Sequence, residues 1–217
     1  AVAGVEYVLR DNAEMNCDEF MYDNSGKYVK LLWDPNRYIN VMCYPFSSDL
    51  DNENGVVLGI SHFPYTTTET YLPGLTTVPY EYLTLENLQY PYCVSLNSRY
   101  IYGEEMYYTL PHELGHYLGL YHVFSEDDDE AVCIDSDYCN DTPSYNREDY
   151  LRYLSWASKH LPYDAYLSEA QLREGCSGEQ FRSVNAMDYN YGAQNQFTAD
   201  QRTRVRHVLR HSPLLPT

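Results

Sequence analysis

The chain has 217 residues, which is enough for one domain with a substantial core or for two lobes around a cleft. Acidic residues outnumber basic ones by 32 to 14, and the formal net charge of -18 argues against nucleic acid and anionic membrane as partners. No apolar run approaches the roughly 20 residues that a membrane-spanning helix needs, so no membrane span is expected.

Three segments in the first half have the β-branched content and the alternation of strands, and they are residues 5–9, 38–44 and 56–60. A stretch rich in Thr, Pro and Tyr follows from residue 63 to 92 and shows little periodicity. We expect it to be an irregular loop. Residues 93–96 are predicted to form another short strand.

The segment from residue 109 to 118 is predicted to be a helix with two histidines on one face. Residues four apart on a helix are separated by about 40° around its axis, so His112 and His116 can reach one metal ion. Glu113 lies beside them, where a carboxylate can take a proton from an activated water. Pro111 limits the start of the helix to about Thr109, unless the helix extends further back with a kink. The opposite face is expected to pack on the sheet and carries Leu110, Leu114 and Leu118.

A third histidine explains the glycine that follows this helix. On a continuing helix, His122 would point about 240° away from His116 and would miss the metal. Gly119 can end the helix in the left-handed conformation, because glycine takes it without a Cβ penalty, and the chain can then return His122 to the metal. Three imidazoles with one open position are typical of a catalytic zinc site rather than a structural one.

Further elements are predicted after the histidines. The run of five acids at residues 126–130 is either a solvated loop or a set of cation ligands. Residues 146–160 have helical spacing, and residues 165–173 are predicted to form a second short helix. This region either walls the substrate pocket or is an insertion without a role in it. Residues 198–201 form a capping box, which predicts a C-terminal helix to about residue 210.

Six cysteines stand at positions 17, 43, 93, 133, 139 and 176, without any Cys-x-x-Cys pair. This pattern favours disulfides in an oxidising compartment, so we expect a protein that is secreted or otherwise extracytoplasmic, in a periplasm or at a cell surface. Six cysteines allow 15 pairings, and the sequence alone does not choose among them.

The histidine motif, followed by a Met-turn, is the signature of the metzincin clan of metalloproteases. The Met-turn candidate is residues 185–189, which contain Met187 and Tyr189. The histidine motif and this Met-turn candidate, together with Asp141-Thr142-Pro143, Phe197-Thr198, Gln201 and Arg204, are most similar to the sequence motifs of the pappalysin (cytophagalysin) family. The likeness covers about the last half of the chain well and the first half loosely.

The resemblance implies an α+β fold in a single catalytic domain of residues 1–217. Its upper subdomain, residues 1–119, is expected to hold a twisted mixed sheet and the active-site helix. Its lower subdomain, residues 120–217, is expected to be irregular and to hold the Met-turn and the C-terminal helix, with the cleft between the two. The resemblance further implies that the strand at 93–96 borders the cleft and pairs with an extended substrate.

The resemblance also implies a zinc-dependent endopeptidase that acts on peptide or protein substrates. We expect the protein to be a monomer. The implied zinc ligands are His112, His116 and His122, and Glu113 is the implied general base. Met187 is expected to form a hydrophobic floor beneath the metal, and Tyr189 to approach it and stabilise the tetrahedral intermediate. A zinc-binding module that keeps the fold without turnover is the competing hypothesis.

Two further features follow only from the resemblance. A calcium ion is implied in the loop that contains Asp137 and Asp141, since calcium takes six to eight oxygen ligands. Cys133 is implied to pair with Cys176. Cys139 lacks the partner that the family provides, so it either pairs elsewhere or stays free. Relatives often prefer a basic residue just after the cut, but residues 190–194 hold no acid here, so no residue preference is predicted.

Overall fold

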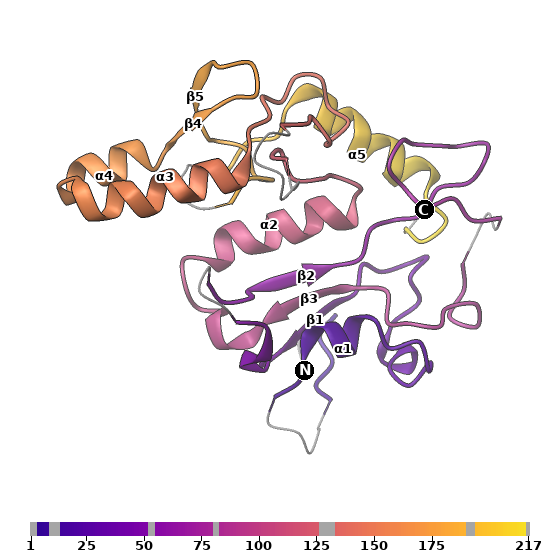
Figure 1. The fold of residues 1–217 in the computed structure, drawn as a ribbon. Coiled ribbons are helices and arrows are strands. Elements are labelled where there is room, and N and C mark those ends of the chain that lie inside the picture. Colours follow the sequence, from indigo (N-terminus) through magenta and orange to yellow (C-terminus); the bar gives the residue numbers. More distant parts are fainter. Residues whose placement is uncertain are drawn as a thin grey trace.

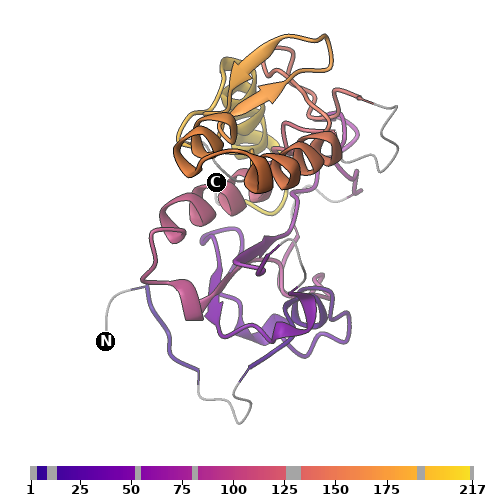
Figure 2. The ribbon, with the colours of Figure 1, turned by 60° about the vertical axis from the view of Figure 1, so that its left-hand side comes forward.

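The computed structural model describes residues 4–8, 14–51, 55–79, 83–125, 133–189 and 194–215. Its long helix α2, Met106–Tyr117, lies between a small sheet on one side and the elements of the second half of the chain on the other (Figures 1 and 2). Helices and strands are mixed in both sequence and space, so the predicted α+β class is confirmed at this level. No helix among the described residues is long and apolar enough to cross a lipid bilayer.

The sheet has three strands in the order β1-β3-β2, which are β1 Val41–Tyr44, β3 Val94–Asn97 and β2 Gly59–Ser61. β1 runs parallel to β3, whereas β2 is antiparallel to it, so the sheet is mixed as predicted. Every residue of β3 is buried, as expected for a central strand that is covered on both faces. Helix α2 covers one face, and the short helix α1, Cys17–Met21, lies on the other (Figure 1).

Two predictions about strands are wrong. Residues 5–8 form no strand, and Val5, Tyr7 and Val8 are 45%, 85% and 51% exposed, while residue 9 lies outside the described residues. The alternation indicates which face a strand would bury, but it does not show that a partner strand lies alongside. The strand predicted at 93–96 is central and not at the border of the cleft, because β1 and β2 flank it as the two edge strands of the described sheet. The described part of the 63–92 stretch forms no helix or strand, as predicted.

Helix α2 begins three residues earlier than the start predicted at Thr109, and Pro111 lies inside it. A proline cannot donate to the carbonyl four residues back, here that of Tyr107. Tyr107 is 80% exposed, so water can serve that carbonyl instead. The predicted inner face is confirmed, because the three leucines pack against the core cluster that includes the sheet residues Val94 and Leu96.

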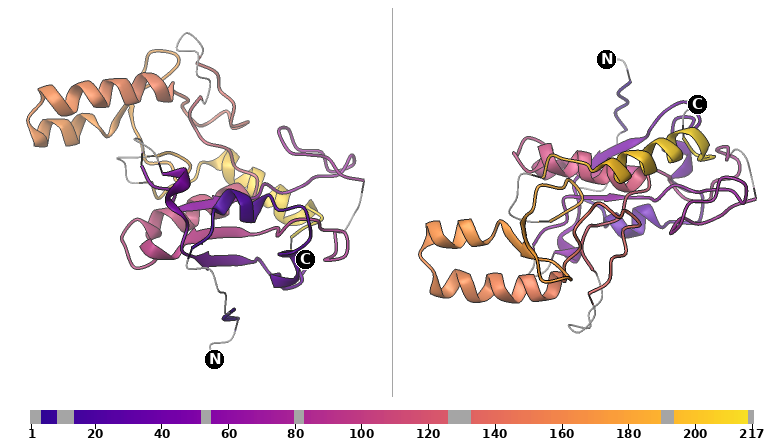
Figure 3. Two further views of the ribbon diagram at one scale, coloured as in Figure 1. Left: turned by 60° about the horizontal axis from the view of Figure 1, so that its bottom comes forward. Right: turned by 90° about the horizontal axis from the view of Figure 1, so that it is seen from above.

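The second half of the chain is built from short elements joined by loops. They are α3 Arg147–His160, α4 Tyr163–Glu169, β4 Leu172–Glu174, β5 Gln180–Arg182 and α5 Ala199–His211. Short 3-10 helices in the first half cover Val29–Leu31, Ser48–Leu50 and Ser98–Tyr100. Helices α3 and α4 lie side by side and project from the body of the molecule (Figure 3).

The helix predictions for this half hold with one correction. α3 follows its cap Asn146, whose side chain accepts from the N–H of Asp149, and α5 follows the predicted capping box at Thr198. The helix predicted at 165–173 is α4, which ends at Glu169. Residues 172–174 instead form β4, because they pair antiparallel with β5, and this strand pairing overrides the helical spacing.

Candidate active site

The three histidines of the motif converge on one point. The Nε2 atoms of His112 and His116 are 3.1 Å apart, and they lie 3.2 Å and 3.0 Å from Nε2 of His122. In a tetrahedral zinc site, nitrogens about 2.0–2.1 Å from the metal lie about 3.3 Å from one another. Among the described residues, this is the one group of three or more His, Cys, Asp or Glu side chains whose ligand atoms converge in this way.

The hydrogen bonds of two of these rings show that they present lone pairs to that point. Nδ1 of His112 is 2.8 Å from the carbonyl of Ala186, and Nδ1 of His116 is 2.8 Å from the carbonyl of Leu120. A carbonyl only accepts a hydrogen bond, so the hydrogen of each neutral ring is on Nδ1. The Nε2 atom of each ring therefore carries a lone pair, and it points toward the place where the Nε2 atoms converge. Burial lowers the pKa of His112 to about 4 and that of His116 well below its ordinary value, which keeps both rings neutral. Lone pairs that point at one another repel unless a cation lies between them, and a set of neutral imidazole nitrogens of this kind fits a zinc ion.

Gly119 shapes this site through the turn that ends α2. Its φ of +90° is the left-handed conformation that the sequence predicts, and a Cβ there would lie 2.9 Å from a methyl of Val208. The N–H of Leu120 then donates to the carbonyl of Gly115 at 2.9 Å. The turn therefore does two things, since it returns the chain to His122 and places the Leu120 carbonyl against His116.

Glu113 lies in a pocket of about 250 Å³ beside the histidines. The described residues that line it are Gly59, Ile60, Ser61, Phe63, Glu113, His116, Tyr121, His122 and Tyr189. All three residues of β2 are among them and none of β3 is, which corrects the predicted bordering strand. No lining residue comes from α3 or α4, so the structure does not support a pocket wall built from these helices.

The Glu113 side chain is packed against β2. A Cβ on Gly59 would lie 2.6 Å from Cγ of Glu113, so only glycine lets the strand approach this closely. The carboxyl group is buried, and burial raises its pKa to about 8. Burial thus favours the protonated form, and a cation held by the three histidines would lower this pKa again and favour the carboxylate that a general base needs.

Met187 is fully buried and packs with Leu120 and Val123, so its predicted place as a floor beneath a metal stays a prediction. A Cβ on Gly115 would lie 2.3 Å from its sulfur, so the glycine of the motif makes room for the methionine. Its neighbour Ala186 supplies the carbonyl that accepts from His112, so the Met-turn both fills the space under α2 and orients a predicted metal ligand.

We expect Gly115→Ala to destabilise the metal-free protein, although alanine is the better helix former by about 1 kcal/mol. The added methyl overlaps the Met187 sulfur, and forcing a methyl into a packed core costs about 1–3 kcal/mol. Urea unfolding in the presence of chelator measures the change in free energy. The double variant Gly115→Ala with Met187→Ala should recover about 1 kcal/mol relative to the sum of the single variants. Additive effects would show that this contact is not the cause.

Tyr189 forms one side of the site. Its ring centroid lies 5.1 Å from that of His112 and 4.5 Å from that of His122. Its backbone is fixed on both sides, because its N–H donates to Asp188 at 2.7 Å and its carbonyl accepts from the Arg173 guanidinium at 3.1 Å. The ring therefore lies next to the convergent histidines and faces the pocket.

A buried ion pair that sequence reasoning missed supports Tyr189. Nε of Arg173 lies 3.4 Å from the carboxylate of Asp188, and both side chains are completely buried. Asp188 also accepts from the hydroxyl of Tyr145 at 2.5 Å and from the hydroxyl of Ser183. Asp188 lies within the Met-turn candidate, directly after Met187, but its sequence position alone indicated no role for it.

The guanidinium of Arg173 is held on its other sides as well. It lies 3.8 Å from the ring centroid of Tyr150 and donates to the carbonyl of Ala170 at 2.8 Å. Since Arg173 belongs to β4 and Tyr150 to α3, this one side chain ties both elements to the Met-turn.

Asp137 and Asp141, the predicted calcium ligands, both accept hydrogen bonds from the protein. The buried carboxylate of Asp137 accepts from the N–H of Cys139 at 2.8 Å and from the hydroxyl of Thr142 at 2.7 Å. The exposed carboxylate of Asp141 accepts from the N–H groups of Ala199 and Asp200 at the start of α5. The acidic run at 126–130 lies outside the described residues, and a calcium site in this loop stays a prediction.

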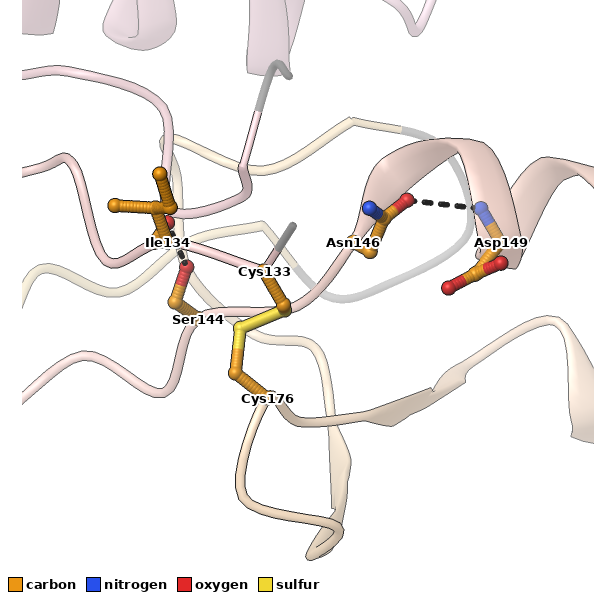
Figure 4. Close-up of a disulfide and its surroundings, with 6 residues drawn as sticks. All are labelled: Cys133, Ile134, Ser144, Asn146, Asp149 and Cys176. Atoms are coloured by element: carbon orange, nitrogen blue, oxygen red, sulfur yellow. Dashed lines mark hydrogen bonds between the residues drawn. A yellow bond between two sulfur atoms is a disulfide. The ribbon is translucent and has the colours of Figure 1, made fainter. Parts of the chain in front are cut away.

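The disulfide between Cys133 and Cys176 is confirmed, with its two Cα atoms 5.4 Å apart (Figure 4). It ties the loop that precedes α3 to the turn that follows β4. The cysteines at 17, 43, 93 and 139 are free, so the chain holds one disulfide and not the three that six cysteines allow. Cys139 is buried and free, which is one of the two outcomes that its missing family partner left open.

Comparison of the sequence with known proteins shows the family to which the chain belongs. A family model described as pregnancy-associated plasma protein-A, peptidase family M43, matches residues 23–210. The chain is 30% identical over 158 residues to an extracellular metalloprotease of Arthroderma otae and equally to one of Arthroderma benhamiae. Each alignment covers 72% of this chain and 47% of the relative, so the chain spans about half the length of these curated relatives.

Proposed function

The chain belongs to the pregnancy-associated plasma protein-A family of metalloendopeptidases, the pappalysins predicted above, and we propose from this premise that it hydrolyses peptide bonds with zinc at the three histidines. The observation that carries the proposal is the convergence of three imidazole nitrogens beside a buried carboxylate in one pocket. The ligands in this proposal are His112, His116 and His122.

In the proposed reaction, a zinc ion bound there supplies Lewis acidity that lowers the pKa of water and polarises the scissile carbonyl. Glu113 takes the proton from the attacking water and hands it to the leaving amine. Its packing against Gly59 holds the carboxylate in one orientation for both transfers. Tyr189 donates a hydrogen bond to the carbonyl oxygen as negative charge develops on it.

We place the substrate along β2 rather than along β3. β1 and β2 are the two edge strands of the described sheet, and only β2 lines the pocket. Such an edge offers backbone donors and acceptors to an extended peptide. The substrate is therefore a peptide or an unfolded segment of a protein. The subdomains in this proposal are residues 1–119 on one side of the pocket and residues 120–217 on the other.

The setting of the enzyme is also part of the proposal. The relatives are named extracellular metalloproteases, and a disulfide is typical of an oxidising compartment, so we propose that the protein is secreted. We propose that it acts as a monomer and that calcium in the loop of Asp137 and Asp141 is its second cofactor.

The test is cleavage of a denatured protein by the purified chain, with the products identified by mass spectrometry. We expect new peptide termini that vanish when 1,10-phenanthroline removes the metal and return when zinc is restored. A protein that binds one zinc ion but cuts no denatured protein would contradict this function and favour the zinc-binding module instead.

A further inference from the structure

The pocket has an aromatic wall beside the predicted metal ligands. The rings of Phe63 and Tyr121 are stacked, with centroids 4.6 Å apart, and the Phe63 ring lies 5.3 Å from that of His116. Both residues are only partly buried and both line the pocket. Their exposed apolar surface is therefore available to whatever enters the site.

The wall is held in place from behind. The hydroxyl of Tyr121 donates to the carbonyl of Gly74 at 2.6 Å, and its ring meets that of Tyr138 edge to face at 5.4 Å. Arg204 lies 5.6 Å from the Tyr121 ring and donates to the carbonyls of Gly119 and Pro73 at 2.5 Å and 2.7 Å. A surface fixed in this way binds a side chain without first paying the entropy of its own ordering.

The position of Glu113 decides which part of a substrate meets this wall. In the proposed reaction Glu113 delivers a proton to the leaving amine, so the leaving part of the substrate lies on its side of the pocket. β2 begins at Gly59, against Glu113, and the chain then continues to Phe63, against His116 and Tyr121. The wall is therefore at the other end of the pocket, on the acyl side of the scissile bond.

We propose that Phe63 and Tyr121 form a specificity subsite that binds a large apolar or aromatic side chain on the acyl side of the scissile bond. This inference rests on the proposed function and names its substrate class. Among the described residues that line the pocket, Glu113 is the only one with a carboxylate and none is Lys or Arg, so the wall offers a charged side chain no partner of its own. An apolar side chain, by contrast, leaves water for a surface of two rings.

The test uses fluorogenic peptides that differ at one residue on the acyl side, compared by kcat/KM. The zinc-loaded wild type should prefer Phe, Tyr or Leu over Gly and Asp by about 10- to 100-fold at one of these positions. Phe63→Ala should reduce that preference to less than about 3-fold, mainly by slowing cleavage of the apolar peptides. Phe63→Leu keeps an apolar wall and should retain most of the preference.

Two controls separate this effect from damage to the fold or to His116. The zinc content and melting temperature of each variant are measured, and Tyr163→Ala removes a tyrosine that is 72% exposed on α4, away from the pocket. A wild type that cleaves without an apolar preference on the acyl side, or whose preference survives Phe63→Ala, overturns the subsite and leaves the proposed function standing. A zinc-loaded wild type that cleaves no peptide overturns the proposed function itself.

Discussion

Replacing Glu113 by glutamine is expected to lower kcat/KM for peptide hydrolysis by about 10²- to 10⁴-fold, the usual contribution of a positioned general base. Glutamine has nearly the same shape and can occupy the same space against Gly59, but its amide cannot accept the proton of the attacking water. The zinc content should stay at one ion per chain, because Glu113 is not among the convergent histidines.

The matched control for this variant is Glu19→Gln, which removes an exposed carboxylate from α1 on the other face of the sheet. It should cleave the same peptides at the rate of the wild type. The thermal stability of Glu113→Gln should not fall, since burial disfavours the charged carboxylate that glutamine replaces. Cleavage by Glu113→Gln at the rate of the wild type would exclude Glu113 as the base.

Replacing Arg173 by methionine is expected to destabilise the metal-free protein by about 3–5 kcal/mol, the usual cost of breaking a buried ion pair. Methionine fills much of the same volume but leaves the buried carboxylate of Asp188 without its cation. The carbonyl of Tyr189 also loses its bond from the guanidinium, whereas that of Ala170 keeps the hydroxyl of Tyr150 as a donor. Urea unfolding of the metal-free protein measures the loss, since bound metal would add its own stabilisation.

Two further variants define this result. Arg173→Met combined with Asp188→Asn should be less destabilised than Arg173→Met alone, because the buried charge is gone. Arg182→Met removes an exposed arginine from β5 and should cost less than about 0.5 kcal/mol. Equal losses for Arg173→Met and Arg182→Met would show that the buried pair does not hold the Met-turn.

The features that the sequence predicts well depend on neighbours along the chain. The spacing of His112 and His116, the left-handed conformation of Gly119 and the cap at Thr198 all follow from residues within about two helical turns. The strand predicted at 5–9 failed because pairing depends on a distant edge. The start predicted for α2 at Thr109 was wrong for a similar reason, since the exposure of Tyr107 is a property of the fold and not of the local pattern.

The contacts that hold the site together could not be read from local patterns. Gly59 against Glu113, Gly115 against Met187 and Arg173 beside Asp188 each join residues that are far apart in sequence or belong to separate elements. One of them left a signal, because a glycine inside a helix costs about 1 kcal/mol relative to alanine and therefore calls for a packing reason. The structure gives that reason as the sulfur of Met187.

The most direct test of the central claim is a zinc titration of the metal-free protein with peptide cleavage as the readout. If His112, His116 and His122 hold one catalytic zinc ion, cleavage should rise from near zero and level off at one equivalent of zinc per chain. The variant His116→Ala should show no such rise at the same zinc concentrations. Full cleavage by the metal-free protein, or an unchanged titration of His116→Ala, would contradict the account.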